Sequence, residues 1–111
     1  MVDEQTKRAA DELLNALRPL DVRAQAMFGG YCFYVGEKVA GLVCNGRIFV
    51  KRSARDELLE GFAELAPAYP GTNNSWRLPV DALRRQPDQI RDIVEQVAAV
   101  LPVRKLRKTN R

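Results

Sequence analysis

The segment of residues 27–51 constrains the fold of this chain more than any other part of the sequence. The pair Gly29-Gly30 interrupts a run of large apolar residues, and Gly36-Glu37 and Asn45-Gly46 follow at short intervals. A leading glycine suits a two-residue hairpin loop, and Asn-Gly is the strongest short hairpin signal. The spacing therefore predicts a β-meander, with the glycine pair at its first corner after a strand over residues 22–28.

Paired glycines also occur in loops where a ligand or another backbone approaches closely. No P-loop or dinucleotide-binding spacing accompanies Gly29-Gly30. A turn, or a bulge between strands, is therefore the favoured interpretation of this pair.

The two later turns also predict a strand register. Two-residue loops pair the residues that flank them: Val35 with Lys38, and Cys44 with Arg47. Working outward, one row crosses three strands: Cys32, Gly41 and Val50. One face of the sheet is then apolar and is expected to pack against helices: Cys32, Tyr34, Val39, Val43, Ile48 and Val50. The other face mixes aromatic residues with cations: Tyr31, Phe33, Leu42, Cys44, Arg47, Phe49 and Lys51.

The face that holds Tyr31, Phe33 and Phe49 has three interpretations. Aromatic residues and arginine are enriched at protein interfaces, which favours a dimer or partner interface. Aromatic rings beside cations also suit the stacking of single-stranded nucleic acid. In the third interpretation, another segment of the same chain covers this face and leaves only its ends exposed.

The sequence offers no recognisable catalytic group. The predicted register places Cys32 and Cys44 on opposite faces of the sheet, so two free thiols are expected. The chain contains no histidine, which removes the usual zinc sites and the Ser-His and Cys-His nucleophile pairs. We therefore expect no enzymatic activity, no metal and no cofactor, and the sequence indicates no small-molecule substrate.

Helical spacing of apolar residues predicts helices outside the meander. They are expected over residues 3–18 with Asp3 as N-cap, over residues 53–65, and from Pro87 to Pro102. One helical turn is predicted over residues 80–85. A short edge strand is predicted over residues 76–79, because Pro79 cannot donate to a central ladder. This order predicts an α+β fold: an antiparallel sheet, formed by the meander and the short edge strand, packed against helices on one face. Residues 1–102 fit a single domain.

The net charge of +4 is unevenly distributed. Residues 1–102 hold 13 basic and 14 acidic residues and sum to −1, whereas residues 103–111 form a basic tail that is expected to be disordered. Residues 23–55 hold six cations and one carboxylate. We expect the contacts to an acidic partner or nucleic acid to come from these two segments: Arg47, Lys51, Arg52, Arg55, Arg104, Lys105, Arg107 and Lys108. The alternative is a solvated face and a solubilising terminus.

The sequence gives no sign of a membrane segment or a secretion signal. No apolar run approaches the ~20 residues that a transmembrane helix needs. The first five residues are polar and acidic, unlike a signal peptide. A cytoplasmic location is expected.

Residues 23–31, together with Phe33-Tyr34 and residues 48–51, resemble the N-terminal domain of the TfoX/Sxy family, which is associated with the bacterial competence regulator. The similarity continues weakly through Leu78-Pro79 and the last helix, so it covers about residues 13–101. Its most specific part is a motif that we expect to maintain the fold: Met27, Phe28, Gly29, Gly30 and Tyr31. The sequence departs from the family pattern at Cys32, usually glycine, at Ala40, usually phenylalanine, and at the turn Gly36-Glu37.

The resemblance implies a cytoplasmic, non-enzymatic protein that takes part in transcriptional regulation through contacts with protein, DNA or both. In the competence regulators the action is co-activation alongside the cyclic-AMP receptor protein at selected promoters. Those regulators carry a second, C-terminal domain, so a stand-alone N-terminal domain is expected here. The alternative is a homodimeric protein-interaction module of unknown role that makes no direct contact with nucleic acid.

Overall fold

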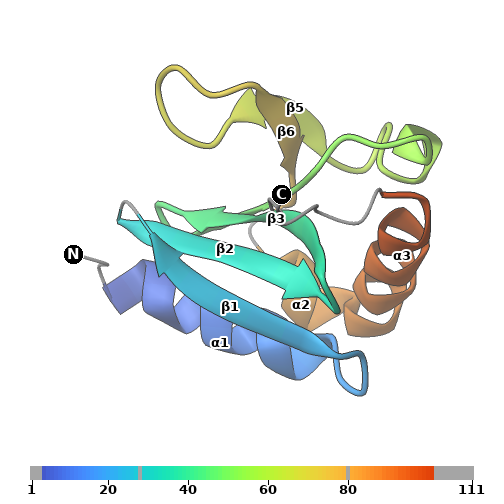
Figure 1. The fold of residues 1–111 in the computed structure, drawn as a ribbon, viewed down its shortest axis with the longest axis horizontal. Coiled ribbons are helices and arrows are strands. Elements are labelled where there is room, and N and C mark those ends of the chain that lie inside the picture. The colour runs from blue at the N-terminus through green and yellow to red at the C-terminus, as the bar shows by residue number, and fades with distance from the viewer. Residues whose placement is uncertain (1–3, 28, 80, 102–111) are drawn as a thin grey trace, which may run out of the picture.

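The computed structural model describes residues 4–27, 29–79 and 81–101. Within these ranges an antiparallel sheet packs against helices on one of its faces, which confirms the predicted α+β fold (Figure 1). The strands lie in the order β1-β2-β3-β4-β6-β5. Their bounds are β1 (Val22–Met27), β2 (Gly30–Val35), β3 (Lys38–Cys44), β4 (Arg47–Val50), β5 (Glu64–Pro67) and β6 (Asn74–Arg77). The helical elements are α1 (Glu4–Ala16), the 3-10 turn η1 (Asp56–Leu58), α2 (Ala82–Arg85) and α3 (Pro87–Val100).

The main core lies between the sheet and the helices. Apolar residues on or directly after α1 and α3 supply the helix side of the core: Ala10, Leu13, Leu17, Ile90, Ile93, Val94, Val97 and Leu101. Phe33, Val43 and Val50 come from the sheet, and all three are fully buried. Burying a side chain of this size contributes about 2 kcal/mol, so this face of the sheet holds most of the stabilising contacts. The described helices include none that is long and apolar enough to cross a membrane.

The two hairpin turns form as predicted, but the register beyond them differs. Val35 pairs with Lys38 and Cys44 with Arg47. A β-bulge then shifts the pairing of β2 with β3 between Phe33 and Tyr34, so that Phe33, not Cys32, lies opposite Gly41. The predicted row of Cys32, Gly41 and Val50 is therefore wrong in its first member.

The shift reverses the faces of β2, because side chains alternate along a strand. Tyr31 and Phe33 belong to the helix-covered face and contact the main core. Cys32 and Tyr34 lie on the opposite face, where Cys32 pairs with Leu42. The predicted assignment of β2 to the two faces is wrong, and so is that of Val39, which pairs with Tyr34 on the face away from the helices. The assignment of Val43, Ile48 and Val50 on β3 and β4 is confirmed.

Cys32 and Cys44 are both buried and form no disulfide, as predicted. The reason given for this prediction was wrong, however. In the observed register Cys44 lies two residues beyond Leu42, the partner of Cys32, so both thiols lie on the same face. Burial raises the pKa of the Cys44 thiol, which keeps this thiol in its less reactive protonated form.

Gly41 allows the bulge to pack closely. A Cβ at this position would lie 2.6 Å from Cε1 of Phe33 and would also meet the carbonyl oxygen of Phe49. Glycine therefore leaves the space that the Phe33 ring fills. Gly30, in the family motif, leaves space in the same way, since a Cβ there would lie 2.9 Å from Sγ of Cys44.

We predict that Gly41→Ala lowers the free energy of unfolding by about 2 kcal/mol through overpacking. Urea denaturation measures this loss. The control is Gly71→Ala, at a position with φ +90 and no atom within 4 Å of the added Cβ. It should cost about 1 kcal/mol through backbone conformation alone. Equal losses in the two variants would contradict the close packing at Gly41.

The chain after β4 differs most from the prediction. The expected helix over residues 53–65 is limited to η1, and β5 begins at Glu64. Gly61 adopts φ +78, which does not continue a right-handed helix, and Leu65 is 40% exposed. The strand predicted over residues 76–79 forms two residues earlier, as β6. Its predicted edge position is wrong, because β6 lies between β4 and β5 and β5 forms the edge. Pro79 falls beyond β6 and therefore removes no ladder hydrogen bond.

Three further predictions are confirmed: the corner at Gly29-Gly30, the helical turn within residues 80–85 and the helix that starts at Pro87. Gly29 has φ +81 and lies in the turn, while Gly30 starts β2. α2 lies within the predicted turn of residues 80–85, and α3 begins at Pro87. The proposed N-cap Asp3, the motif residue Phe28 and the tail residues lie outside the described residues.

Candidate functional site

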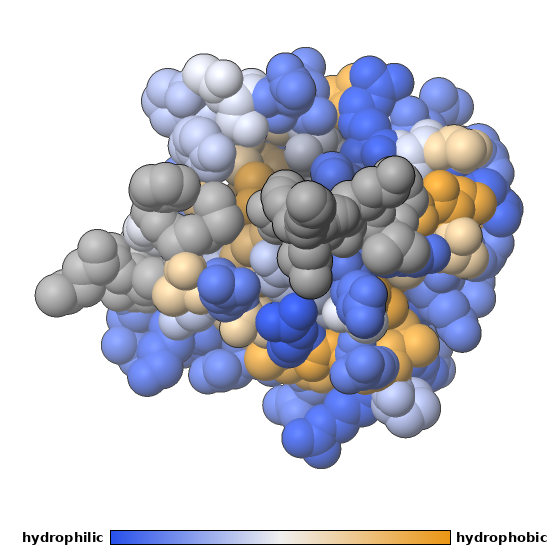
Figure 2. Space-filling model, viewed as in Figure 1, coloured by the Kyte–Doolittle hydropathy of each residue, from blue (hydrophilic) through white to orange (hydrophobic). Residues whose placement is uncertain are grey.

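A groove lies on the face of the sheet that the helices leave uncovered. Its volume is about 610 Å³, and it runs between β3, the chain leaving β4 and the start of β6. The lining residues are Val39, Gly41, Leu42, Lys51, Arg52, Thr72, Asn73, Asn74 and Ser75. The β5–β6 hairpin rises from the sheet on this side (Figure 1). Figure 2 shows mostly hydrophilic surface around this side of the molecule, with apolar surface recessed beside the hairpin.

The groove combines an apolar floor with polar walls. Val39 and Leu42 are half-buried, whereas Lys51 and Arg52 are exposed. The opposite wall is a run of side chains with hydroxyl and amide groups at residues 72–75, which can donate and accept hydrogen bonds. The arrangement can hold an extended segment that carries both apolar and acidic side chains.

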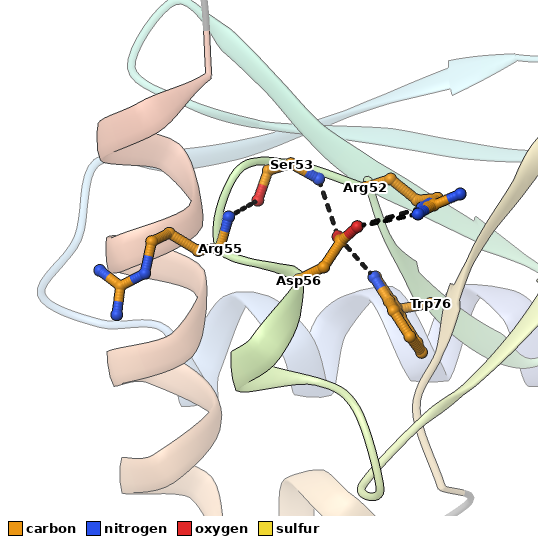
Figure 3. A network of polar contacts seen from close by, with 5 residues as sticks. All are labelled: Arg52, Ser53, Arg55, Asp56 and Trp76. Carbon is orange, nitrogen blue, oxygen red and sulfur yellow. Dashed lines mark hydrogen bonds and ion pairs between the residues drawn. The ribbon is translucent and has the colours of Figure 1, made fainter.

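A network around Asp56 fixes the cationic wall (Figure 3). The Asp56 carboxylate accepts hydrogen bonds from the Ser53 amide at 2.9 Å and from Nε1 of Trp76 at 2.8 Å. Its other oxygen accepts from Nε of Arg52 at 3.2 Å and from Nη2 at 3.1 Å. The Ser53 hydroxyl in turn accepts from the amide of Arg55 at 3.0 Å. The predicted pairing of Ser53 with Asp56 therefore forms, but only the single turn η1 follows it, and Arg55 is the residue at its N-cap.

The pKa of Asp56 is held below its ordinary value. Burial alone would raise this pKa, but the hydrogen bonds from Trp76, Ser53 and Arg52, together with the Arg52 charge, outweigh it. The carboxylate is therefore charged at neutral pH and positions the Arg52 side chain at the groove.

The four described cations that the sequence analysis selected do not form one surface. Lys51 and Arg52 line the groove. Arg55 forms an exposed ion pair with Glu57 at 2.7 Å, and this hydrogen bond lowers the pKa of Glu57. Arg47 donates to the carbonyl oxygen of Leu78 at 2.9 Å and lines a different pocket. Arg104, Lys105, Arg107 and Lys108 lie outside the described residues.

Two further cations of residues 23–55 are also engaged within the fold. The Arg23 guanidinium stacks over the Tyr34 ring at 4.4 Å from its centroid. Lys38 donates to the carbonyl oxygen of Ala98 in α3 at 2.8 Å. Of the six cations in this basic segment, Lys51 alone has no such contact with the residues that the structure describes.

The proposed aromatic interface of Tyr31, Phe33 and Phe49 does not exist as one exposed surface. Phe33 is 0% exposed in the main core, and Tyr31 packs against that core. Phe49 is 3% exposed on the opposite face, where it packs with Cys44 and Ala68. The interpretation that another segment of the chain covers this face is confirmed for Phe49, because Ala68, which follows β5, packs against it.

Sequence reasoning missed the polar wall of the groove. The sequence analysis does not single out residues 72–75, although four consecutive side chains there carry hydroxyl or amide groups. Such a run beside a strand end is a signal for a binding surface, but its position opposite Lys51 depends on how β6 pairs with β4. The described residues hold no group of three or more histidine, cysteine or acidic side chains that could bind a metal.

Two comparisons place the chain among known proteins. The TfoX N-terminal domain family matches residues 12–100. An uncharacterized 12.7 kDa protein in the trpE 5' region of Spirochaeta aurantia is 37% identical over 90 residues, which cover 80% of this chain and 76% of that protein. The motif glycines, the meander and the final helix all lie inside the matched range, and the chain therefore belongs to the TfoX N-terminal domain family.

Proposed function

We propose that this protein is a cytoplasmic regulatory protein without catalytic activity, which binds an acidic segment of a protein partner in the groove beside Lys51. The observation that carries the proposal is the combination of a half-buried apolar floor with two exposed cations and a wall of hydroxyl and amide groups. Grooves that bind extended peptides combine pockets for side chains with hydrogen-bonding groups for the backbone. Membership of the TfoX N-terminal domain family supports a role in transcriptional regulation, with competence-type genes as the finer part of the proposal.

Charge favours a protein partner over direct binding of DNA by the folded domain. Residues 4–101 contain 13 basic and 13 acidic residues, a net charge of zero. Surfaces that bind duplex DNA are strongly positive. Most cations of the basic segment are engaged within the fold, as described above. DNA binding through residues 103–111 is the second candidate, because five cations lie within nine residues there.

We predict that Lys51→Glu weakens the binding of a short synthetic peptide in which glutamate and leucine alternate. The variant removes the exposed ion pair between Lys51 and a glutamate of the peptide, which costs about 1 kcal/mol, or about fivefold in Kd. Fluorescence anisotropy measures the affinity. The control is Lys7→Glu, which reverses an exposed charge on α1 away from the groove and should leave Kd unchanged.

NMR of the backbone amides locates the bound peptide. The proposal expects saturable shifts at Leu42, Lys51 and Asn73. Shifts confined to other surfaces, or equal losses of affinity in the two charge variants, would overturn it. Duplex DNA distinguishes the second candidate: if the tail carries the function, DNA binds in a salt-dependent manner, deletion of residues 103–111 abolishes it, and the groove amides do not shift.

A further inference from the structure

A second pocket lies at the end of the sheet where β4, β5 and β6 meet, and it is separate from the groove of the proposed function. Its volume is about 480 Å³. The lining residues are Arg47, Gly61, Phe62, Ala63, Glu64, Arg77 and Pro79. None of them lines the Lys51 groove. Its size lies within the range of small-molecule sites.

Two arginines from neighbouring strands meet at this pocket. Phe49 of β4 pairs with Arg77 of β6, and Arg47 lies two residues before Phe49. Arg47 and Arg77 therefore lie on the same face of the sheet as diagonal neighbours across the two strands. Both arginines line the pocket.

The hydrogen bonds of both arginines are incomplete. Nη2 of Arg47 donates to the Leu78 carbonyl oxygen at 2.9 Å, and Nη2 of Arg77 forms an ion pair with Glu64. The Nε atoms of both side chains are enclosed, and no acceptor among the described residues reaches either of them. Buried donors without an acceptor are rare in folded proteins and call for an explanation. Here two of them occur at one pocket.

The positive charge of the pocket is also only partly neutralised. Two guanidinium groups face one carboxylate, that of Glu64, whose side chain is 69% exposed. Arg77 is 32% exposed, so its ion pair can open toward solvent. An oxyanion that enters between the arginines would accept from the guanidinium forks and balance the excess charge, since this geometry matches carboxylate and phosphate groups.

We propose that this pocket binds the oxyanion group, carboxylate or phosphate, of a small organic ligand, with Arg47 and Arg77 as its donors. The remaining wall supplies contacts for the organic part of the ligand, because Phe62, Ala63 and Pro79 are apolar. Because both Nε atoms are enclosed, the proposal requires each arginine side chain to shift when the ligand binds. The proposal uses none of the residues of the Lys51 groove, so either proposal can fail without the other.

NMR of the arginine Nε–H groups tests the proposal directly. The probes are phenyl phosphate and benzoate, each compared with sodium chloride at equal ionic strength. We expect saturable shifts of the Arg47 and Arg77 signals with at least one probe, and the tighter probe identifies the oxyanion class. Shifts that sodium chloride reproduces, or shifts that do not saturate, would overturn the proposal.

We predict that Arg77→Gln weakens binding of the better probe by about tenfold or more, because a charge-assisted hydrogen bond is lost. The control is Arg84→Gln, which removes an exposed arginine paired with Glu12 on the helix side and should leave the affinity unchanged. Arg47→Lys keeps the positive charge but removes the fork, and should also weaken binding. Thermal unfolding of each variant confirms that it folds. A folded Arg77→Gln variant with unchanged affinity would refute the site.

Discussion

Replacing Phe33 with alanine should lower the free energy of unfolding by about 4 kcal/mol, the largest effect that we expect from one substitution. The ring is 0% exposed and lies in the main core, and Gly41 leaves the space for it. Truncation removes the buried ring and leaves a cavity that the rigid sheet cannot close. Urea denaturation, monitored by the fluorescence of Trp76, measures the loss.

The result discriminates between the two registers of β2. In the register predicted from the hairpin turns alone, Phe33 lies on the face away from the helices, and its truncation would cost less. The control is Leu65→Ala on β5, where the side chain is 40% exposed and the expected loss is below about 1 kcal/mol. Similar losses for Phe33→Ala and Leu65→Ala would contradict the observed bulge.

The bulge also shows how far the sequence predicts this sheet. Local turn chemistry fixes the pairs beside each turn, and Val35 with Lys38 and Cys44 with Arg47 follow from Gly36-Glu37 and Asn45-Gly46. A bulge between Phe33 and Tyr34 leaves no comparable local signal, because it depends on how Phe33 packs over Gly41. A shift of one residue then places the side chains of β2, and Val39 opposite Tyr34, on the face opposite to the predicted one.

After β4, too, local signals predict the local hydrogen bonds but not the long-range pairing. The pair Ser53 and Asp56 predicts a helix start, and the hydrogen bonds of that start are present. The apolar spacing of Leu58, Leu59 and Phe62 also resembles a helix, but Gly61 and the pairing of β5 with β6 end it. Long-range pairing of this kind cannot be read from local periodicity.

The candidate site was predictable only in part. Lys51 and Arg52 were selected from charge alone and do line the groove. Arg47 was selected for the same reason, yet it lies at the second pocket with Arg77, which charge patterning did not single out. The position of each arginine depends on the order of β4, β6 and β5, and this order is a property of the whole sheet.

Asp56→Ala should cost about 3 kcal/mol near neutral pH, and the cost should depend on pH. The carboxylate accepts hydrogen bonds from Trp76, Ser53 and Arg52, and a hydrogen bond to a charged group contributes about 1.5–3 kcal/mol. Trp76 is buried, so the variant also leaves its indole N–H without this acceptor. Urea denaturation at a series of pH values measures the difference from the wild type.

The sign of the pH dependence follows from the lowered pKa of Asp56. Its ordinary value is 3.8, and the folded protein holds it lower. The stabilisation is therefore fully present above the unfolded-state pKa and is lost as the pH falls through the folded-state pKa. The difference between wild type and Asp56→Ala should be constant near neutral pH and should shrink in acid.

Asp56→Asn separates the charge from the hydrogen bonds. Asparagine keeps an oxygen that accepts from Trp76 and Ser53, but it loses the ion pair with Arg52. We expect a smaller loss of about 1 kcal/mol, since Arg52 is exposed and its pairing is screened by water. Equal losses in the two variants, or a loss in Asp56→Ala that does not change with pH, would show that the carboxylate does not hold η1 against β6. If the predicted order holds, the Asp56 network both stabilises the fold and keeps Arg52 at the wall of the groove.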